Sequence, residues 1–288
     1  MALVRLCESR QMRYESLMTL GVDLVRYKDS QAPCSCMRMF IVMTMLSIDR
    51  MTPTLRPGYP LVGYHRWSNL LFIHWRVPVE LVAPLIPSQL TLDTWDGDAW
   101  IGLVPFEMSG VRPWWSPAVR GISAFLETNV RTYVHYQGRD PGVWFFSLDA
   151  SNPIAVKLAR WFWYLSYYDA MMMSRIETDY WAFSSQRKNQ TTDQLNCAAR
   201  LGSPLPCAEA GTLDHFLVER YILYAQSPRS GLYQGRVHHQ PYALQEATLE
   251  NCEQSLLDAA GIPVSGEPVH VVASPGVNVE VFPLRRLV

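Results

Sequence analysis

The sequence predicts an α+β protein that is mostly β, in which a largely antiparallel sheet closes around a lined cavity and a few helices flank it. Two neighbouring segments carry this prediction. Residues 125–136, FLETNVRTYVHY, alternate so that a carboxylate, an amide and a guanidinium share one face of a strand. Residues 143–148, VWFFSL, are apolar on both faces, which is typical of a strand buried on both sides. A strand beside such a neighbour is expected to face an enclosed space.

Composition limits the class of protein. The chain has 288 residues, of which 49% are hydrophobic, and a formal net charge of -1. This is enough apolar material for one large core. Because no long run of Lys or Arg is present, we expect no nucleic-acid partner and no polybasic membrane anchor. We expect a small-molecule ligand, and we leave a homo-oligomeric assembly open.

The six cysteines show neither paired metal-site spacing nor a dense disulfide framework, so we expect free thiols in a reducing cytoplasm and no metal site. The apolar run at residues 37–46 is too short to cross a bilayer and has no small-residue cleavage site. We therefore expect a cytoplasmic protein without a membrane partner.

Residues 1–50 show no strand alternation and no capped helix. We expect them to be a disordered or mis-called N-terminal extension, with Met51 as the true start. Residues 51–288 contain no repeat or linker and are expected to form a single domain.

The elements of this domain follow from local patterns. Residues 70–77 predict a strand, and residues 78–87 predict a short helix bounded by prolines. Strands at 90–95 and 99–108 flank Asp96-Gly97, a dipeptide that favours hairpin turns, and are expected to pair.

The strands at 125–136 and 143–150 are joined by the turn QGRDPG. A helix is then expected at 153–164, because Asn152 can cap it and proline follows at the first helical position. The remaining predicted elements follow in chain order: strands at 180–186 and 196–202, a helix at 213–219 capped by Thr212, strands at 220–225, 232–240 and 243–250 with the last two paired, a helix ending at Gly261, and strands at 269–273 and 277–284.

Several ordered motifs carry a resemblance to a known family. The segments LLFIHWRVP, AWIGLVPFEMSGVRP, ETNVRTYV, FFSLDASNPIAVKLAR and SPGVNVEVFPLRR resemble the YqjF-like family of uncharacterised bacterial proteins. The resemblance covers nearly everything from Met51 onward. The family has no settled activity to carry over.

A more distant resemblance is to acetoacetate decarboxylase and its relatives, through a strand with a glutamate, a hairpin, the pattern LDxxxPIA and a helix. It implies an antiparallel, cone-like β-barrel with helices outside and an apolar pocket that holds acidic and basic residues. On this resemblance Glu127 and Glu107 match the pocket glutamates of the relatives.

The sequence departs from those decarboxylases at the lysine that forms their Schiff base. Tyr167 and Tyr168 stand where the relatives have two lysines, and tyrosine cannot form an iminium. Of the lysines in the chain, Lys157 is the one remaining candidate, and we expect it to be exposed to solvent. A Schiff-base decarboxylase that uses Lys157 is therefore the least favoured reading, and no cofactor is expected.

Two hypotheses remain for the function. In the first, a lysine-independent enzyme acts on a small carboxylate or carbonyl compound: Arg131 holds the acid group, Glu127 is the general acid or base, and Tyr168 or His238 donates to an oxyanion. In the second, a non-catalytic binding or sensing protein uses the same cavity. His238 is assigned to the cavity and its neighbour to the outside. The remaining expected ligand-binding residues are Glu107, Asn129 and Tyr167.

Overall fold

The computed structural model of the chain describes residues 24–25, 40–41, 48–154, 156–157, 163–227, 231–264 and 266–288. The chain separates into two compact units, Met1–Ser47 and Ile48–Val288. In the first unit, strands β1 (Leu24–Val25) and β2 (Phe40–Ile41) pair in antiparallel fashion. Most of the segment for which we expect disorder lies outside the described residues, so the domain boundary at residue 51 stays a prediction.

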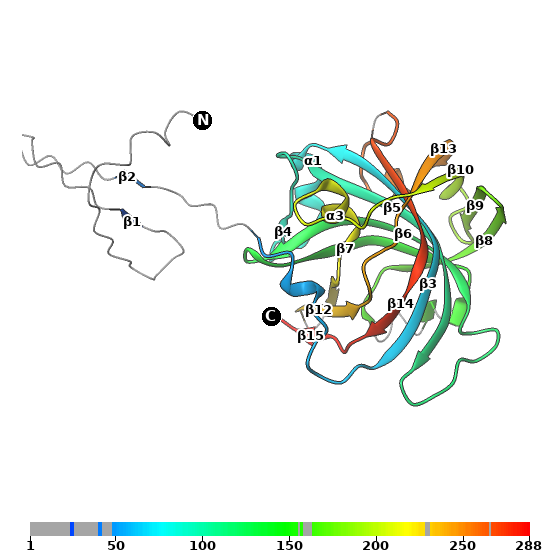
Figure 1. The fold of residues 1–288 in the computed structure, drawn as a ribbon, viewed down its shortest axis with the longest axis horizontal. Helices are drawn as coiled ribbons and strands as arrows, with labels where there is room; N and C mark the ends of the chain where they lie inside the picture. Colours follow the sequence, from blue (N-terminus) through cyan, green and yellow to red (C-terminus); the bar gives the residue numbers. More distant parts are fainter. Residues whose placement is uncertain are drawn as a thin grey trace, which may run out of the picture. The chain divides into compact units, whose positions relative to one another are not determined.

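The second unit consists mainly of strands (Figure 1). Its strands are β3 (Gly63–Val77), β4 (Thr91–Leu92), β5 (Ala99–Pro113), β6 (Phe125–Tyr136), β7 (Arg139–Ala150), β8 (Tyr167–Glu177), β9 (Tyr180–Arg187), β10 (Gln194–Pro204), β11 (Ile222–Ser227), β12 (Gly231–His238), β13 (Gln245–Gln254), β14 (His270–Val281) and β15 (Arg285–Arg286). Its short helices are η1 (Thr52–Thr54), α1 (Val79–Val82), η2 (Ala83–Leu85), α3 (Leu213–Val218) and α4 (Leu256–Ala259). The fold is therefore mostly β with few helices, as expected.

The strand pairings among the described residues form a closed ring. The sheet runs in the order β15-β12-β11-β7-β8-β9-β10-β13-β14-β3-β5-β6-β4, and β6 also pairs with β7. The strands from β7 through β14 and β3 to β6 therefore form a closed circuit of hydrogen-bonded neighbours. A second route joins β7 to β14 through β11 and β12.

Two pairings are parallel, in a sheet whose other described pairings are antiparallel, in keeping with the largely antiparallel sheet that we expect. Strands β8 and β11 both run parallel to β7, along different parts of its length. A parallel neighbour requires a connection that carries the chain back to the starting end of the strand. Residues 151–166, which include the predicted helix, provide this connection between β7 and β8.

The hairpin prediction at Asp96-Gly97 is correct for the turn and wrong for the strands. Asp96 and Gly97 both have positive φ, 53° and 85°, and Trp95 and Asp98 form an isolated bridge. Strand β4, however, pairs with β6 through Thr91 and Leu92 instead of with β5. Strand β13 likewise pairs with β10 and β14, and not with β12 as expected.

The last two predicted strands are a single strand, β14, which pairs with β3 along its whole length. Gly276 has a φ of 123°, and a Cβ placed there would lie 2.0 Å from the carbonyl oxygen of Trp67. Only glycine fits so close to β3, so the break that we expected in the strand is a local distortion within it.

The predicted helix caps are confirmed where they are described. His215 donates its backbone N–H to Oγ1 of Thr212 at the start of α3, across 3.3 Å. Asn152 accepts from the backbone N–H of Ile154 across 3.0 Å, and the described residues of the predicted helix at 153–164 include Val156, which is buried. Ile154 is 50% exposed. Residues 158–162 lie outside the described residues.

Strand β6 is buried on both of its faces from Glu127 to Val134. One face carries Glu127, Asn129, Arg131 and Tyr133, and we call it the helix-covered face because α3 contacts it and Val156 packs against its neighbours Leu148 and Ala150. The opposite face carries Val130 and Val134, which belong to the largest hydrophobic cluster. The polar side of the strand is thus enclosed by protein, as its apolar neighbour β7 indicates.

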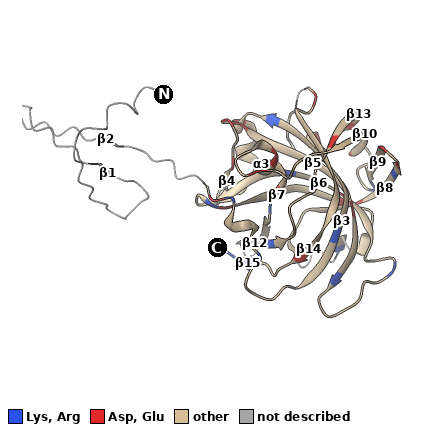
Figure 2. Cartoon of the chain, in the orientation of Figure 1, with Lys and Arg blue, Asp and Glu red and all other residues tan. Residues whose placement is uncertain are grey.

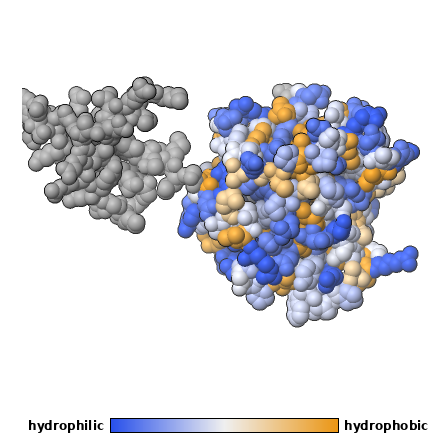
Figure 3. Space-filling model, viewed as in Figure 1, coloured by the Kyte–Doolittle hydropathy of each residue, from blue (hydrophilic) through white to orange (hydrophobic). Residues whose placement is uncertain are grey.

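The surface of the second unit mixes charges and apolar groups. Lys and Arg residues are interspersed with Asp and Glu residues along its strands and loops (Figure 2). Polar residues surround small apolar patches on the visible face (Figure 3). Among the described residues, no helix is long and apolar enough to span a bilayer.

Candidate functional site

Three polar side chains of β6 occupy alternate positions of the helix-covered face. Glu127 is 2% exposed, Asn129 is 7% exposed and Arg131 is 8% exposed. A strand rises by about 3.4 Å per residue, so the Cα atoms of Glu127 and Arg131 are about 13 Å apart.

Glu127 is surrounded by hydrogen-bond donors and apolar groups. Tyr167 donates its hydroxyl to Oε2 of Glu127 across 3.0 Å, and Asn129 also hydrogen-bonds to the carboxyl group. Burial raises the pKa of Glu127 to about 8, because it outweighs these two hydrogen bonds, and the charge of Asp149 raises the pKa further. Glu127 is therefore protonated at neutral pH and can act as a proton donor.

The neighbouring strands line the same face with apolar residues. Opposite Glu127, Asn129 and Arg131, strand β5 places Phe106, Val104 and Gly102. A Cβ at Gly102 would lie 3.3 Å from Cγ of Arg131, so glycine makes room for the arginine side chain. The polar groups of β6 thus lie opposite apolar residues and a glycine of β5.

Arg131 has a buried positive charge without a matching negative charge. Its Nη2 donates to the carbonyl oxygen of Leu217 across 2.9 Å, and its guanidinium lies 5.6 Å from the ring centroid of Phe72. Its Nε has no hydrogen-bond partner, and no described carboxylate forms an ion pair with it. Buried charges in proteins are normally paired because an isolated one costs several kcal/mol. Arg131 therefore places a cation on the helix-covered face without an ion-pair partner among the described residues.

Further buried polar atoms near this face have no partner among the described residues. Asn129 Oδ1 is one of them, and Trp67 Nε1 and His239 Nε2 are two more. Trp67 lies against Phe106, with ring centroids 6.1 Å apart, and against His239, with centroids 5.9 Å apart. Neither Trp67 nor Phe106 is among the site residues that we expect from the sequence. The alternation of β3, which places Trp67 opposite Met108 on β5, is the pattern that indicates Trp67.

Tyr168 lies on the other side of the sheet from Glu127. Tyr167 and Tyr168 are neighbours on β8, and successive side chains of a strand point to opposite faces. The guanidinium of Arg187 lies 3.8 Å from the ring centroid of Tyr168, and Arg187 also binds Asp149 with N–O distances of 3.0 Å. Tyr168 is therefore removed from the catalytic hypothesis, and Tyr167 is the tyrosine that contacts Glu127.

Glu107 also faces away from Glu127. On β5 it stands opposite Leu126 of β6, whereas Phe106 stands opposite Glu127. Its Oε1 accepts a hydrogen bond from Ser174 across 2.8 Å, and Ser174 in turn accepts one from the indole of Trp181. The two glutamates implied by the decarboxylase resemblance therefore do not share one pocket.

His238 is not the buried histidine of its pair. Strand β12 ends at His238, whose Nδ1 lies 3.2 Å from the carbonyl oxygen of Thr54. His239 is 3% exposed and stacks on Tyr221 with ring centroids 4.4 Å apart. The assignment of His238 to the cavity is therefore wrong, because Val237 and His239 share the buried face and His238 points the other way.

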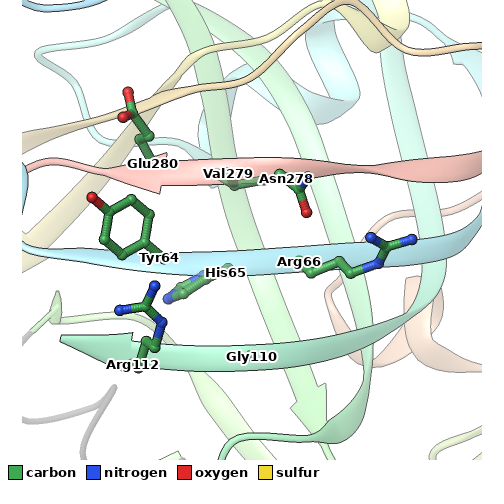
Figure 4. A pocket seen from close by; sticks show the side chains of 8 residues that line it. All are labelled: Tyr64, His65, Arg66, Gly110, Arg112, Asn278, Val279 and Glu280. Atoms are coloured by element: carbon green, nitrogen blue, oxygen red, sulfur yellow. The ribbon is translucent and has the colours of Figure 1, made fainter. Parts of the chain in front are cut away.

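An open groove of about 340 Å³ lies elsewhere, across β3, β5 and β14 (Figure 4). Its charged groups have partners within the fold. Arg112 lies 4.5 Å from the ring centroid of Tyr64, and Glu280 binds Arg56 across 2.6 Å. None of the predicted site residues lines this groove. Within the part of the chain that the structure describes, no group of three or more His, Cys, Asp or Glu residues could hold a metal ion.

Comparison with known proteins gives the family. Residues 64–278 match the DUF2071 family, which is described as an uncharacterized conserved protein. The chain belongs to this family. The uncharacterized protein YqjF of Bacillus subtilis (strain 168) is 40% identical over 222 residues, which are 76% of this chain and 90% of the relative. The YqjF-like resemblance is thereby confirmed.

Solved structures give a related fold. The enduracididine biosynthesis enzyme MppR complexed with pyruvate has a TM-score of 0.55 and 11% identity, over 79% of this chain and 91% of that one. Acetoacetate decarboxylase from Legionella pneumophila has a TM-score of 0.53 and 14% identity, over 82% of this chain and 91% of that one. At these identities the likeness shows the fold alone, and it confirms that the fold is similar to that of acetoacetate decarboxylase.

Proposed function

We propose that this DUF2071 protein binds a small carboxylate or carbonyl compound between Glu127 and Arg131. The closed circuit of strand pairings supports an interpretation of the sheet as a cone-like barrel with the ligand enclosed. The observation that carries the proposal is the buried guanidinium of Arg131, which lacks an ion-pair partner among the described residues. A ligand carboxylate supplies the missing charge through a charge-assisted hydrogen bond to Nε.

In the enzymatic form of the proposal, Glu127 is a general acid. Its raised pKa of about 8 keeps it protonated at neutral pH. It donates its proton to the carbonyl oxygen of the bound ligand as negative charge develops there, and Tyr167 then stabilises the resulting carboxylate through its hydrogen bond. Asn129 Oδ1 accepts a hydrogen bond from a ligand hydroxyl.

The described lysines support a mechanism without a Schiff base. Lys157 and Lys188 are both exposed, and Lys188 lies 3.6 Å from Asp169. A Schiff-base lysine needs a desolvated amine near the ligand. Neither residue has this environment, so the chemistry is assigned to Glu127.

Pyruvate is the first probe. It carries a carboxylate beside a carbonyl, which suits a cation and a proton donor held on one strand. The structure of MppR complexed with pyruvate, a protein of similar fold, supports this choice. The free thiols of Cys197, Cys207 and Cys252 are in keeping with the cytoplasmic location that we propose.

The alternative is a non-catalytic binding or sensing protein that makes the same contacts. The two functions differ in the role of Glu127. A catalytic acid gives a rate that falls as the pH rises above its pKa, whereas a binder needs only a fixed hydrogen bond. The observation that favours the enzyme is the pKa of about 8, since raised carboxyl pKa values cluster at catalytic sites.

Calorimetric titration with pyruvate tests the proposal. We expect binding by the wild type, loss of binding in Arg131→Met, and retained binding in Glu127→Gln. Arg175→Met is the matched control, because Arg175 lies on β8 with 74% of its side chain exposed. Unchanged affinity in Arg131→Met refutes the site. If turnover of any carbonyl acid is found, Glu127→Gln must abolish it, and turnover that survives shows that Glu127 is not the general acid.

A further inference from the structure

Four ionisable side chains form one continuous hydrogen-bonded chain that reaches the Arg131 end of the helix-covered face. Asp214 Oδ1 lies 2.7 Å from His270 Nε2, and His270 Nδ1 lies 2.9 Å from His74 Nδ1. His74 Nε2 lies 2.8 Å from the hydroxyl of Tyr133. Arg131 Nη2 lies 3.5 Å from the same hydroxyl. Every link within the chain is of normal hydrogen-bond length.

The chain runs from solvent into the core. The side chain of Asp214 is 43% exposed and that of His270 is 10% exposed, whereas His74 and Tyr133 are fully buried. His270 also lines an open groove of about 320 Å³. The outer end of the chain can therefore exchange protons with water, and the inner end cannot do so directly.

At neutral pH the outer carboxylate sets the direction of every hydrogen bond. Asp214 can only accept, so His270 must carry a proton on Nε2. In neutral His270 the Nδ1 atom is then an acceptor, so His74 donates from its own Nδ1. His74 Nε2 is left as an acceptor, and the hydroxyl of Tyr133 donates to it.

One added proton at the outer end reverses the whole chain. Protonated His270 donates from both ring nitrogens, so His74 Nδ1 becomes the acceptor and the proton of neutral His74 moves to Nε2. The hydroxyl of Tyr133 must then donate elsewhere. The carbonyl oxygen of Leu217 lies 2.9 Å away and accepts it. The structure thus provides Tyr133 with one acceptor for each direction.

We propose that Asp214, His270, His74 and Tyr133 form a proton relay between solvent and the Arg131 end of the helix-covered face. In outward transfer, Tyr133 takes a proton from an acidic group of the ligand and passes its own proton to His74 Nε2. His74 passes the Nδ1 proton to His270 Nδ1, and His270 passes the Nε2 proton to Asp214, which releases it to water. One proton leaves the site, and each O–H or N–H bond that breaks is replaced by one that forms.

The charges around the relay suit this role. Burial, the neighbouring His270 and Arg131 hold the pKa of His74 well below its ordinary value, so this residue passes protons without retaining one. The guanidinium groups of Arg131 and Arg220 lie 5.6 and 4.9 Å from the ring centroid of Tyr133. Arg220 is itself paired with Asp93, and Glu267 lines the groove with His270.

The test follows the tautomer of His74 by long-range ¹H–¹⁵N correlation in ¹⁵N-labelled, ligand-free protein. We expect the Nδ1–H tautomer at neutral pH and a change to the Nε2–H tautomer on acidification, without a change in the charge of His74. His239 is an internal control, because its Nδ1 lies 2.8 Å from the carbonyl oxygen of Gln240 and its tautomer is fixed. A histidine with a purely structural role keeps one tautomer at all pH values.

Asp214→Asn is the decisive variant, because the side chain is 43% exposed and asparagine has the same shape. An asparagine side chain can donate as well as accept, so it no longer fixes the direction of the chain, and we expect both His74 tautomers to be populated at neutral pH in this variant. A constant His74 tautomer in the wild type, or an Nδ1–H tautomer alone in Asp214→Asn, overturns the relay. Only the ligand as inner proton donor rests on the proposed function, so a failure to bind pyruvate leaves this test unaffected.

Discussion

Tyr167 donates a hydrogen bond to Glu127 across 3.0 Å, inside a setting that still keeps the carboxyl group protonated at neutral pH. Burial dominates because the ionised carboxylate loses more hydration energy than it gains from its hydrogen bonds with the Tyr167 hydroxyl and the Asn129 amide. A proton on Glu127 is therefore a property of the folded state, and it can be measured without knowledge of the ligand.

The first prediction concerns the pH dependence of stability. The pKa of Glu127 is raised from 4.5 to about 8 on folding, so between these pH values the folded state holds a proton that the unfolded state has lost. Stability from this group is fully present below pH 4.5 and falls by about 1.4 kcal/mol per pH unit up to pH 8. Urea unfolding at several pH values should show this slope in the wild type and its absence in Glu127→Gln. Parallel slopes in the two proteins contradict the assignment.

The second prediction concerns the energetic cost of Arg131. Because its buried charge has no anionic partner among the described residues, Arg131→Met should leave the free energy of unfolding unchanged or raise it by about 1 to 3 kcal/mol. The same variant should lose pyruvate binding. A fall in stability of several kcal/mol would show that Arg131 supports the fold and is not held there for a ligand.

The third prediction concerns the ion pair beside Tyr168. Arg187 and Asp149 are 5% and 1% exposed in their side chains and are in contact at 2.9 Å. Arg187→Met should cost about 3 to 5 kcal/mol, because it leaves Asp149 buried without its partner. Adding Asp149→Asn should recover part of the loss, as a double-mutant cycle by urea unfolding can show.

A control for this cycle is available on β8. Arg175 pairs with Glu177, and their side chains are 74% and 57% exposed. Arg175→Met should change the free energy of unfolding by about 0.5 kcal/mol or less, since exposed ion pairs contribute little. Equal losses for Arg187→Met and Arg175→Met would mean that burial does not determine the strength of the inner pair.

The fourth prediction concerns Lys157. Because this residue is exposed, borohydride treatment in the presence of acetoacetate should leave it unmodified, as mapped by mass spectrometry of peptides. Lys157→Ala should also leave pyruvate binding unchanged. A reduced adduct on Lys157 would restore the Schiff-base mechanism that the sequence argues against.

Local patterns predicted the parts of the fold that local interactions determine. The alternation of residues 125–136 identified the shared face of Glu127, Asn129 and Arg131, and Thr212 was recognised as a helix cap. Local patterns do not predict which strands pair. Strand β4 is followed by a tight turn that leads to β5, but it pairs with β6, about forty residues away. Pairing over that separation depends on which faces must be buried together.

The site errors have the same origin. Tyr168 was assigned by its place in a family pattern, but β8 was not expected at those residues, so the alternation that separates it from Tyr167 could not be applied. His238 is assigned to the cavity together with Arg236 or Gln240, but Val237 and His239 are the buried pair, and they share the other face. Alternation separates two adjacent side chains, and it does not tell which of the two faces is buried.

The common origin of Glu127, Asn129 and Arg131 on a single strand limits which ligands can fit between them. Strand β6 is hydrogen-bonded to β5 on one side and β7 on the other, so the spacing between the backbone positions of Glu127 and Arg131 is fixed. Among acids with the same reactive groups, binding affinity should therefore depend on the length of the carbon chain between them.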